Sequence, residues 1–152
     1  MKCISWNVNG YRAALGKGFL DYLAKESPDI ICLQETKANQ SDIPDEKHTP
    51  PGYHSVWHSA ERKGYSGVAL FTKKKPNTVF EGFGLSNYDC EGRVVSADYG
   101  PFTILGVYFP NGQSGEERLL YKLDFYRDFF NYCQELRDSG KELIICGDYN
   151  TA

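Results

Sequence analysis

Oxygen-bearing side chains follow apolar segments at three separate places in this chain. Asp, Glu, Asn and Gln are acceptors, and the amides are also donors, so each place could bind a cation or an anion. The side chains are Asn7 and Asn9 in "ISWNVNG", Gln34 and Glu35 in "IICLQET", and Asp148 and Asn150 in "LIICGDYN". Ligands of α/β proteins bind at the carboxyl ends of strands, so these ends predict one shared site.

The chemistry of this set favours a hard cation beside an anion. Carboxylate and amide oxygens suit Mg²⁺, which is satisfied by one or two carboxylates together with a substrate phosphate. An amide can also donate to a phosphate oxygen, which a carboxylate cannot do. Taken singly, each motif is more typical of a turn or a helix cap, and the prediction depends on all three meeting at one edge.

Two further segments add candidates. Tyr108 is the next-to-last residue of an apolar strand in "VYFPNG", and it is either a core tyrosine or a phenol directed at the same site. Glu91 and Arg93 stand at the entrance of another strand. They form either a surface ion pair or, for the arginine, a contact to phosphate.

Hydrophobic periodicity predicts the elements that carry these residues. One helix is expected from Arg12 to Lys25. A second is expected from Glu116 to Asp138, with a capping box at Ser114 and Glu117 and Gly140 as its stop. The apolar stripe of the second helix is predicted to be Leu119, Leu123, Tyr126, Phe130 and Cys133. Strands are predicted over 2–6, 29–33, 53–58, 67–72, 78–83, 93–99, 102–109 and 142–146.

The strands "DIICL", "FTILGVYF" and "ELIIC" are apolar on both faces, which is typical of the middle of a covered sheet. Two helices can cover one face, and the remaining strands are too few for a full second layer. The pattern therefore predicts a layered α/β fold that is incomplete.

Composition is that of a globular protein. The 152 residues are 41% hydrophobic and 24% charged, with a net charge of −3. No apolar run approaches the ~18 residues needed to span a bilayer, so no membrane association is expected, and the N-terminus reads as a cytoplasmic start. Five cysteines, an odd number without C-x-x-C spacing, indicate reduced thiols, with those at 3, 32 and 146 buried in strands. The short basic run at 73–75 does not by itself predict nucleic-acid binding.

Six segments in order resemble the exonuclease III family of abasic-site endonucleases, within the wider endonuclease/exonuclease/phosphatase superfamily. They are "SWNVNGYRA", "PDIICLQETK", "GYSGVALF", "EGRVVSADYG", "VYFPNGQSGEERLLYKLDFY" and "IICGDYN". The resemblance runs from Lys2 to Ala152. It implies a DNase I-like four-layer α/β sandwich, of which this chain supplies the first sheet and part of the cleft as the N-terminal portion of one domain.

The resemblance also implies roles for individual residues. Asn7 and Glu35 match residues that hold the catalytic Mg²⁺, for which Mn²⁺ could substitute, and Asp148 and Asn150 belong to the same metal and phosphate site. Asp148 matches the carboxylate that activates water or protonates the leaving group, and Tyr108 the tyrosine near the scissile phosphate. Asn9 stands where some relatives have Asp. The positions that match contacts to the DNA backbone are Tyr65, Arg93 and Asn111.

The implied function is Mg²⁺-dependent hydrolysis of phosphodiesters at abasic sites in duplex DNA, with 3′–5′ exonuclease and 3′-repair activity. The family pattern continues to a Ser-Asp-His that this sequence lacks. A missing C-terminal half is therefore an expected partner, and the chain alone is expected to be inactive. Two alternatives remain: a fragment that binds DNA or a partner without catalysis, and a phosphodiesterase acting on a small molecule or lipid.

Overall fold

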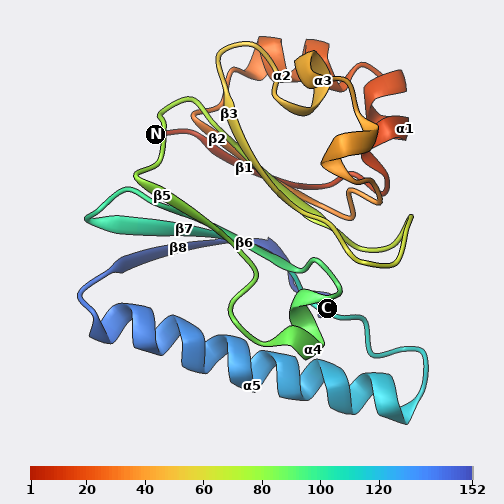
Figure 1. The fold of residues 1–152 in the computed structure, drawn as a ribbon, viewed down its shortest axis with the longest axis vertical. Coiled ribbons are helices and arrows are strands. Elements are labelled where there is room, and N and C mark those ends of the chain that lie inside the picture. The colour runs from red at the N-terminus through yellow and green to blue at the C-terminus, as the bar shows by residue number, and fades with distance from the viewer. Residues whose placement is uncertain (152) are drawn as a thin grey trace.

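Two β-sheets pack face to face, and helices cover the outer face of each (Figure 1). The structure is a computed structural model and describes residues 1–151. From one outer face to the other, the layers are helices, sheet, sheet and helices. This is a four-layer α/β sandwich.

The first sheet has the strand order β1-β2-β4-β3. β1 (Cys3–Asn7) runs parallel to β2 (Ile30–Gln34), while β4 (Val68–Thr72) is antiparallel to both β2 and β3 (His54–His58). The parallel pair is joined by a helical crossover, as parallel strands require. β1 therefore lies at one edge of the sheet and β3 at the other.

The second sheet has the order β5-β6-β7-β8. β5 (Thr78–Glu81), β6 (Val94–Asp98) and β7 (Phe102–Tyr108) are antiparallel neighbours. β8 (Glu142–Asp148) is parallel to β7, and a long helix connects the two. Each sheet thus ends in a parallel pair, and the edge strands of these pairs, β1 and β8, contact each other across the sandwich.

The helices divide between the two outer faces. The first sheet carries those from residues 11–48, and the second carries α4 and the long helix (Figure 1). They are α1 (Tyr11–Gly16), α2 (Phe19–Glu26), the 3₁₀ turn η1 (Gln40–Asp42), α3 (Asp45–His48), α4 (Ser86–Asp89) and α5 (Glu116–Asp138).

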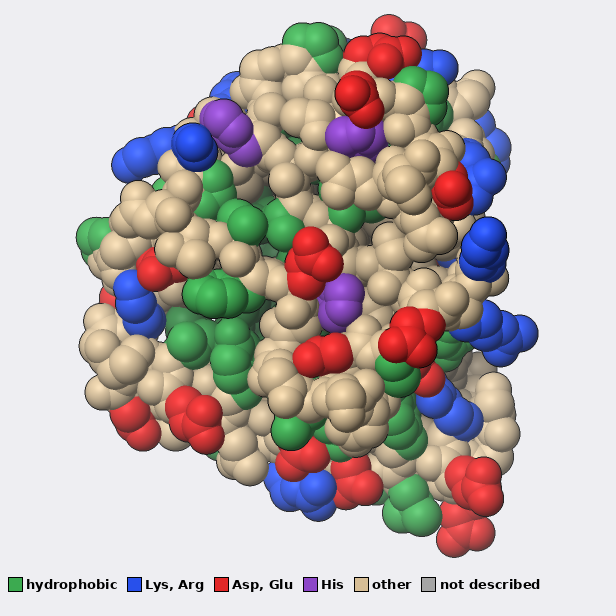
Figure 2. Space-filling model, in the orientation of Figure 1, with side chains coloured by type: hydrophobic (Ala, Val, Ile, Leu, Met, Phe, Trp, Pro, Cys, Tyr) green, Lys and Arg blue, Asp and Glu red, His purple; other side chains and the backbone are tan. Residues whose placement is uncertain are grey.

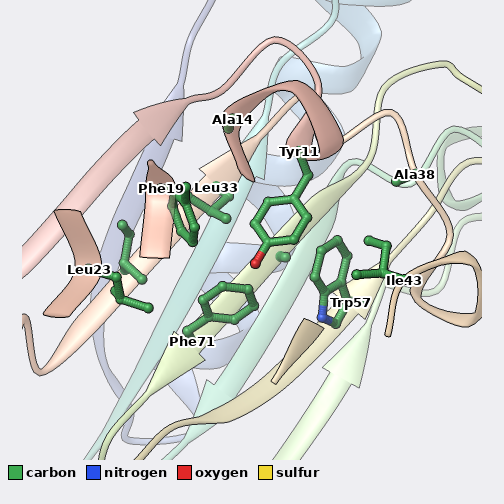
Figure 3. Packing of buried hydrophobic residues seen from close by; sticks show 11 residues of the cluster. Tyr11, Ala14, Phe19, Leu23, Leu33, Ala38, Ile43, Trp57 and Phe71 are labelled. Carbon is green, nitrogen blue, oxygen red and sulfur yellow. The ribbon is translucent and has the colours of Figure 1, made fainter. Parts of the chain in front are cut away.

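Alternation along the central strands divides the interior into three apolar layers. On β2, Ile31 and Leu33 face the first helical layer, whereas Ile30 and Cys32 face the second sheet. Under the helices, the rings of Tyr11, Phe19, Trp57 and Phe71 pack edge-on or tilted against one another (Figure 3). The layer beneath α5 is equally aromatic and includes Phe109, Phe125 and Phe129.

The expectation that this chain supplies only the first sheet is wrong. Strands from residues 54–108 divide between two sheets, so each sheet covers one face of the other. What stays partly exposed is an edge: most residues of β1 are exposed, and every residue of β8 is at least partly exposed. Cys3, expected to be buried, is exposed for this reason, and all five thiols are free.

Two expectations about helices also fail. The helix predicted from Arg12 to Lys25 is interrupted at Gly18, whose φ of 88° is left-handed and separates α1 from α2. In α5 the buried residues are Phe125, Phe129 and Cys133, so Cys133 is the one member of the predicted stripe that is buried. The capping box is absent as well, since the N-cap is Gly115 without a side-chain hydrogen bond.

Most of that predicted stripe lies outside. Leu119, Leu123 and Phe130 are 46%, 55% and 67% exposed, so α5 is apolar on two sides. The hydrophobic periodicity of α5 therefore predicted the wrong side of the helix, the one with fewer aromatic residues, as the buried side. In the face seen in Figure 2, Asp and Glu lie at the centre as well as the rim, while Lys and Arg stand mainly at the rim. Among residues 1–151, no helix is long and apolar enough to cross a bilayer.

Candidate active site

The parallel pairs bring four polar residues to one edge of the sandwich. Asn7 ends β1 and Glu35 directly follows β2; Tyr108 ends β7 and Asp148 ends β8. Within each sheet the ends are aligned, because Asn7 pairs with Gln34 and Tyr108 with Asp148. The contact between β1 and β8 then places both sets of ends together.

A hydrogen-bond network joins these four residues. The Asn7 side-chain amide donates to Glu35 Oε1 at 2.9 Å and to Asp148 Oδ2 at 2.8 Å. The Tyr108 hydroxyl donates to the same Glu35 Oε1 at 2.8 Å. Asn7 thus bridges the two carboxylates, which come from different sheets and lie 113 positions apart in the sequence (148 − 35).

The network changes the acidity of its members in opposite directions. Partial burial would raise the pKa of Glu35, but hydrogen bonds from Asn7, Lys37 and Tyr108 favour the carboxylate and hold its pKa below the usual value. Burial and the adjacent Glu35 carboxylate raise the pKa of the Tyr108 hydroxyl well above that of free tyrosine. Near neutral pH, Glu35 is therefore an anion and Tyr108 a hydrogen-bond donor.

Backbone strain is concentrated at this edge. Left-handed backbone is uncommon outside glycine and costs free energy. Six non-glycine residues within 1–151 have positive φ, and five of them lie in the loops of this edge or beside them. Those five are Asn9 (46°), Glu35 (51°), Lys37 (50°), Ser66 (46°) and Asn150 (50°).

The loop after β2 is braced by backbone hydrogen bonds. Thr36 N–H donates to Gly67 O at 3.1 Å and Lys37 N–H to Ser66 O at 2.9 Å. A Cβ on Gly67 would lie 2.3 Å from Thr36 Oγ1, and its φ is +88°. Glycine is required here by both space and conformation.

The loop after β8 is held differently. Lys122 Nζ on α5 donates to Asn150 O at 2.5 Å, and the Tyr126 hydroxyl donates to Tyr149 O. The Asn150 side-chain amide donates to Phe109 O at 2.7 Å, and its backbone N–H donates to Asp148 Oδ1 at 2.9 Å. Side chains of α5 therefore fix this turn from beneath.

A charged cluster lies behind Tyr108. Arg93 is 2% exposed; its Nε donates to Glu91 at 2.6 Å, one terminal nitrogen to Tyr108 O at 3.0 Å and the other to the Tyr65 hydroxyl at 3.1 Å. The guanidinium also lies over the Tyr108 ring, 5.0 Å from its centroid. Arg118 pairs with the other Glu91 oxygen at 2.9 Å.

These contacts keep Glu91 ionised. Burial would raise its pKa, but the two arginines outweigh burial and lower it. Tyr65, Glu91 and Arg118 also line an open hollow of about 460 Å³, together with Arg62. Arg93 supports Tyr108 from inside, whereas Arg62 and Arg118 present charge to this hollow.

The structure brings together most of the candidates from the sequence, but not all. Asn111 is exposed, and its side chain accepts from Gln113 N–H in a local turn instead of joining the network. Gln34 is buried, and its amide donates to Ser5 Oγ and Cys32 instead of the cleft. Asn9 reaches the edge, and its side-chain oxygen accepts from Lys37.

Sequence reasoning missed Lys37, Arg118, Lys122 and Tyr126 as participants. Lys37 could have been found, because it stands two positions after Glu35 in the same motif. Lys122 and Tyr126 gave no such signal, because they donate to main-chain carbonyls.

The donor set suits a hard divalent cation. Within residues 1–151, no three His, Cys, Asp or Glu side chains converge as a ready metal cluster. The site instead offers two carboxylates, Glu35 and Asp148, with the amides of Asn7, Asn9 and Asn150 nearby. Two carboxylates with amide oxygens fit a cation that keeps several waters and takes further oxygens from a phosphate.

The fold is a four-layer α/β sandwich. Its site, with two carboxylates, amides and a tyrosine at one edge of the strands, suits a metal ion beside an anion. The chain belongs to the Endonuclease/Exonuclease/phosphatase family, whose sequence profile matches residues 4–152. The resemblance to exonuclease III and abasic-site endonucleases is confirmed by its relatives.

The chain is 44% identical to "DNA-(apurinic or apyrimidinic site) endonuclease" from Dictyostelium discoideum, covering all of this chain and 42% of the relative. It is also 44% identical to "Exodeoxyribonuclease" from Bacillus subtilis, covering 59% of that protein. The Xenopus laevis APE2 catalytic domain superposes with a TM-score of 0.88 at 33% identity, covering 100% of this chain and 59% of the other. The chain thus spans about half the length of the relatives it matches.

Proposed function

We propose that this chain is part of a DNA repair nuclease that hydrolyses phosphodiesters at abasic sites in duplex DNA. We further propose 3′–5′ exonuclease or 3′-repair activity for the whole protein, and a cytoplasmic location. The observation that carries the proposal is the network in which Asn7 and Tyr108 hold Glu35 and Asp148 at one strand edge. Relatives named as abasic-site endonuclease and exodeoxyribonuclease support the substrate class.

The metal in this proposal is Mg²⁺, with Mn²⁺ as a substitute. Glu35, together with Asn7, Asp148 and Asn150, would hold it, and when bound it would neutralise charge on a phosphate oxygen. The lowered pKa of Glu35 supports this role, because a cation ligand must be ionised near neutral pH.

The other residues act on the phosphate and the water. Asp148 takes a proton from the attacking water or returns one to the leaving oxygen, as a general base or acid. Tyr108 and Asn150 donate hydrogen bonds to phosphate oxygens in the transition state. The raised pKa of Tyr108 keeps its hydroxyl protonated for that purpose.

DNA is proposed to lie across the same edge. Tyr65 and Arg118 line the hollow beside Tyr108 and are placed to meet a neighbouring backbone phosphate. Asn111 stands on the exposed loop after β7 and is proposed to contact the DNA backbone from there. Arg93 could contact phosphate only by leaving its buried partners, so its geometry favours support of Tyr108 over direct contact.

A C-terminal half of the same fold is the proposed partner of this chain. The edges β1 and β8 are only partly covered, and the relatives are about twice as long. Beside β8, a hollow of about 480 Å³ is lined by Phe130, Ile145 and Tyr149 among others. Residues 1–152 alone are proposed to be inactive and to self-associate through these surfaces.

The decisive experiment uses the whole gene product that carries residues 1–152. Cleavage of an abasic duplex is measured with and without Mg²⁺, and an intact duplex and an inositol phosphate serve as competing substrates. We expect Mg²⁺-dependent nicking of the abasic strand only. Preferential hydrolysis of the inositol phosphate would favour the small-molecule phosphodiesterase, and DNA binding without cleavage would favour a non-catalytic module.

The isolated chain is then tested separately. Light scattering gives its mass in solution, and nicking is assayed with and without the C-terminal half added in trans. A monodisperse monomer that nicks at the rate of the whole protein would overturn the proposal that this half is insufficient.

A further inference from the structure

Lys37 holds a place beside Glu35 that none of the proposed roles explains. Its ammonium lies 3.0 Å from Glu35 Oε2 and 2.5 Å from Asn9 Oδ1. The Lys37 side chain is 36% exposed and that of Glu35 21%, so the pair is partly shielded from solvent. A cation already sits against one oxygen of the carboxylate assigned to the metal.

The two oxygens of Glu35 have separate partners. Oε1 accepts from Asn7 and Tyr108, both neutral donors, whereas Oε2 contacts only the Lys37 ammonium among the recorded polar contacts of residues 1–151. Asn9 Oδ1 accepts a hydrogen bond from the same ammonium. Lys37 therefore binds the two oxygens that would otherwise be open to a cation there.

The backbone is left-handed at the residues that make this contact. Lys37 has a φ of 50°, a conformation that a residue with a long side chain adopts at a free-energy cost. The loop keeps it there through the hydrogen bond from Lys37 N–H to Ser66 O. Glu35 and Asn9, its two side-chain partners, are also left-handed, so three strained residues converge on one ion pair.

We propose that Lys37 competes with the divalent cation for Glu35 Oε2 and Asn9 Oδ1, and so sets the metal affinity of the site. This inference rests on the proposed function, because it assumes that Glu35 is a metal ligand, and it adds Asn9 Oδ1 to the oxygens that the cation would meet. Lys37 keeps the carboxylate ionised and oriented before the metal arrives, and it must leave these oxygens when the metal binds. Its role is positioning and competition, without contact to the reacting atoms.

The sign of the effect distinguishes this role from a structural one. If Lys37 only oriented Glu35, removing it would weaken metal binding. If it competes, removing its charge strengthens binding, because a unit charge within several ångströms of a divalent cation is worth about tenfold or more in affinity even at high dielectric constant.

The test is titration of the metal-free whole protein with Mn²⁺ at one pH, followed by calorimetry or by the electron paramagnetic resonance of free Mn²⁺. We expect Lys37→Met to lower the Mn²⁺ Kd about tenfold or more, and Lys37→Arg to leave it within a few-fold of wild type. Lys63→Met removes the same charge from an exposed position with no recorded contact to this site, and it should leave Kd unchanged.

Lys37→Gly keeps the test valid if the methionine variant folds poorly. Glycine accepts a φ of 50° without strain, so this variant should melt no lower than wild type while also binding Mn²⁺ more tightly. Unchanged or weaker Mn²⁺ binding in folded Lys37→Met and Lys37→Gly would overturn the inference. If Glu35→Gln binds Mn²⁺ as well as wild type does, or if wild type binds none, the assignment of Glu35 as a metal ligand in the proposed function fails instead.

Discussion

The two carboxylates of the site sit in turns that look alike but are built differently. Glu35 follows β2, a strand that is buried throughout, and its turn is braced by main-chain hydrogen bonds to residues 66 and 67. Asp148 ends β8, an edge strand that is exposed or half-buried throughout, and its turn is held by side chains of α5. The first turn is fixed by the sheet itself, and the second depends on a helix that packs beneath it.

The comparison predicts where each turn is vulnerable. The turn after β2 should tolerate changes in distant side chains. It should not tolerate a substitution of Gly67, which packs against Thr36. The β8 turn should respond to changes in α5, some distance from the reaction. The following experiments are ordered from the largest expected effect to the smallest, and all use the whole gene product.

Glu35→Gln tests the chemical role of the β2 turn. It keeps the shape of the side chain but removes the charge that would hold the metal, and loss of several kcal/mol of transition-state stabilisation should lower turnover by about 10³-fold. Abasic-duplex affinity should change little. Near wild-type cleavage in limiting Mg²⁺ would show that Glu35 is not the metal ligand.

Tyr108→Phe and Asn150→Ala remove one phosphate donor from each sheet edge. Each should lower turnover by about 10²–10³, which is typical for loss of one preorganised donor. Steady-state kinetics should show the loss mainly in kcat. A rise in KM with unchanged kcat would instead mark either residue as a uniform binding group.

Glycine substitutions test the space inside each turn. A Cβ at Gly147 would lie 2.1 Å from Val107 O, and one at Gly67 would lie 2.3 Å from Thr36 Oγ1 with φ at +88°. Gly147→Ala and Gly67→Ala should each destabilise the protein by about 1–3 kcal/mol, measured by denaturant unfolding. Gly16→Ala is the control, because its Cβ meets nothing within 4 Å, and it should be neutral or stabilising.

Tyr126→Phe tests the dependence of the β8 turn on α5. It removes the hydroxyl that donates to the Tyr149 carbonyl and also contacts Thr151 Oγ1 at 2.8 Å, but it keeps the ring that stacks on Phe109 at 4.5 Å. We expect a loss of about 0.5–1.5 kcal/mol in unfolding free energy and a modest fall in kcat. Tyr22→Phe, at a tyrosine 36% exposed and remote from the turn, is the matched control.

The smallest effect concerns pH. The pKa of Glu35 is lowered in the folded protein, so the free energy that its ionisation contributes is present above the unfolded pKa of about 4.3. That contribution is lost as pH falls through the lower folded pKa. The difference in melting temperature between wild type and Glu35→Gln should therefore shrink below about pH 4. A difference that stays constant from pH 7 to pH 3 would contradict the lowered pKa.

The sequence was informative where a residue's position along a strand determines its place. Asn7, Glu35 and Asp148 follow apolar runs, and parallel pairing brings the ends of such runs to one edge. The eight predicted strands and the limits of α5 agree with the structure within a few residues. These features depend on local pattern, which a single sequence contains.

The sequence was not informative where two apolar faces, or two arrangements of strands, fit the same hydrophobic pattern. Periodicity could not choose between the two apolar sides of α5, because Leu123 and Phe125 are both hydrophobic and only packing on β7 and β8 selects Phe125. It also could not divide the strands between two sheets. That division depends on close approach between the sheets, such as Gly106 against Cys32, where a Cβ would lie 2.7 Å from the sulfur.

The burial of β2 on both faces has a consequence for strand register during folding. A slip by one residue would exchange Ile31 and Leu33 for Ile30 and Cys32, and each layer would still receive apolar side chains. Hydrophobic alternation therefore cannot exclude the misaligned pairing. Two contacts can exclude it. Cys32 packs against Gly106, where there is no room for a larger side chain, and the buried Gln34 amide donates to Ser5 Oγ at 3.1 Å. Gly106 and Gln34 thus specify the register of β2, the strand that positions Glu35 in the cleft.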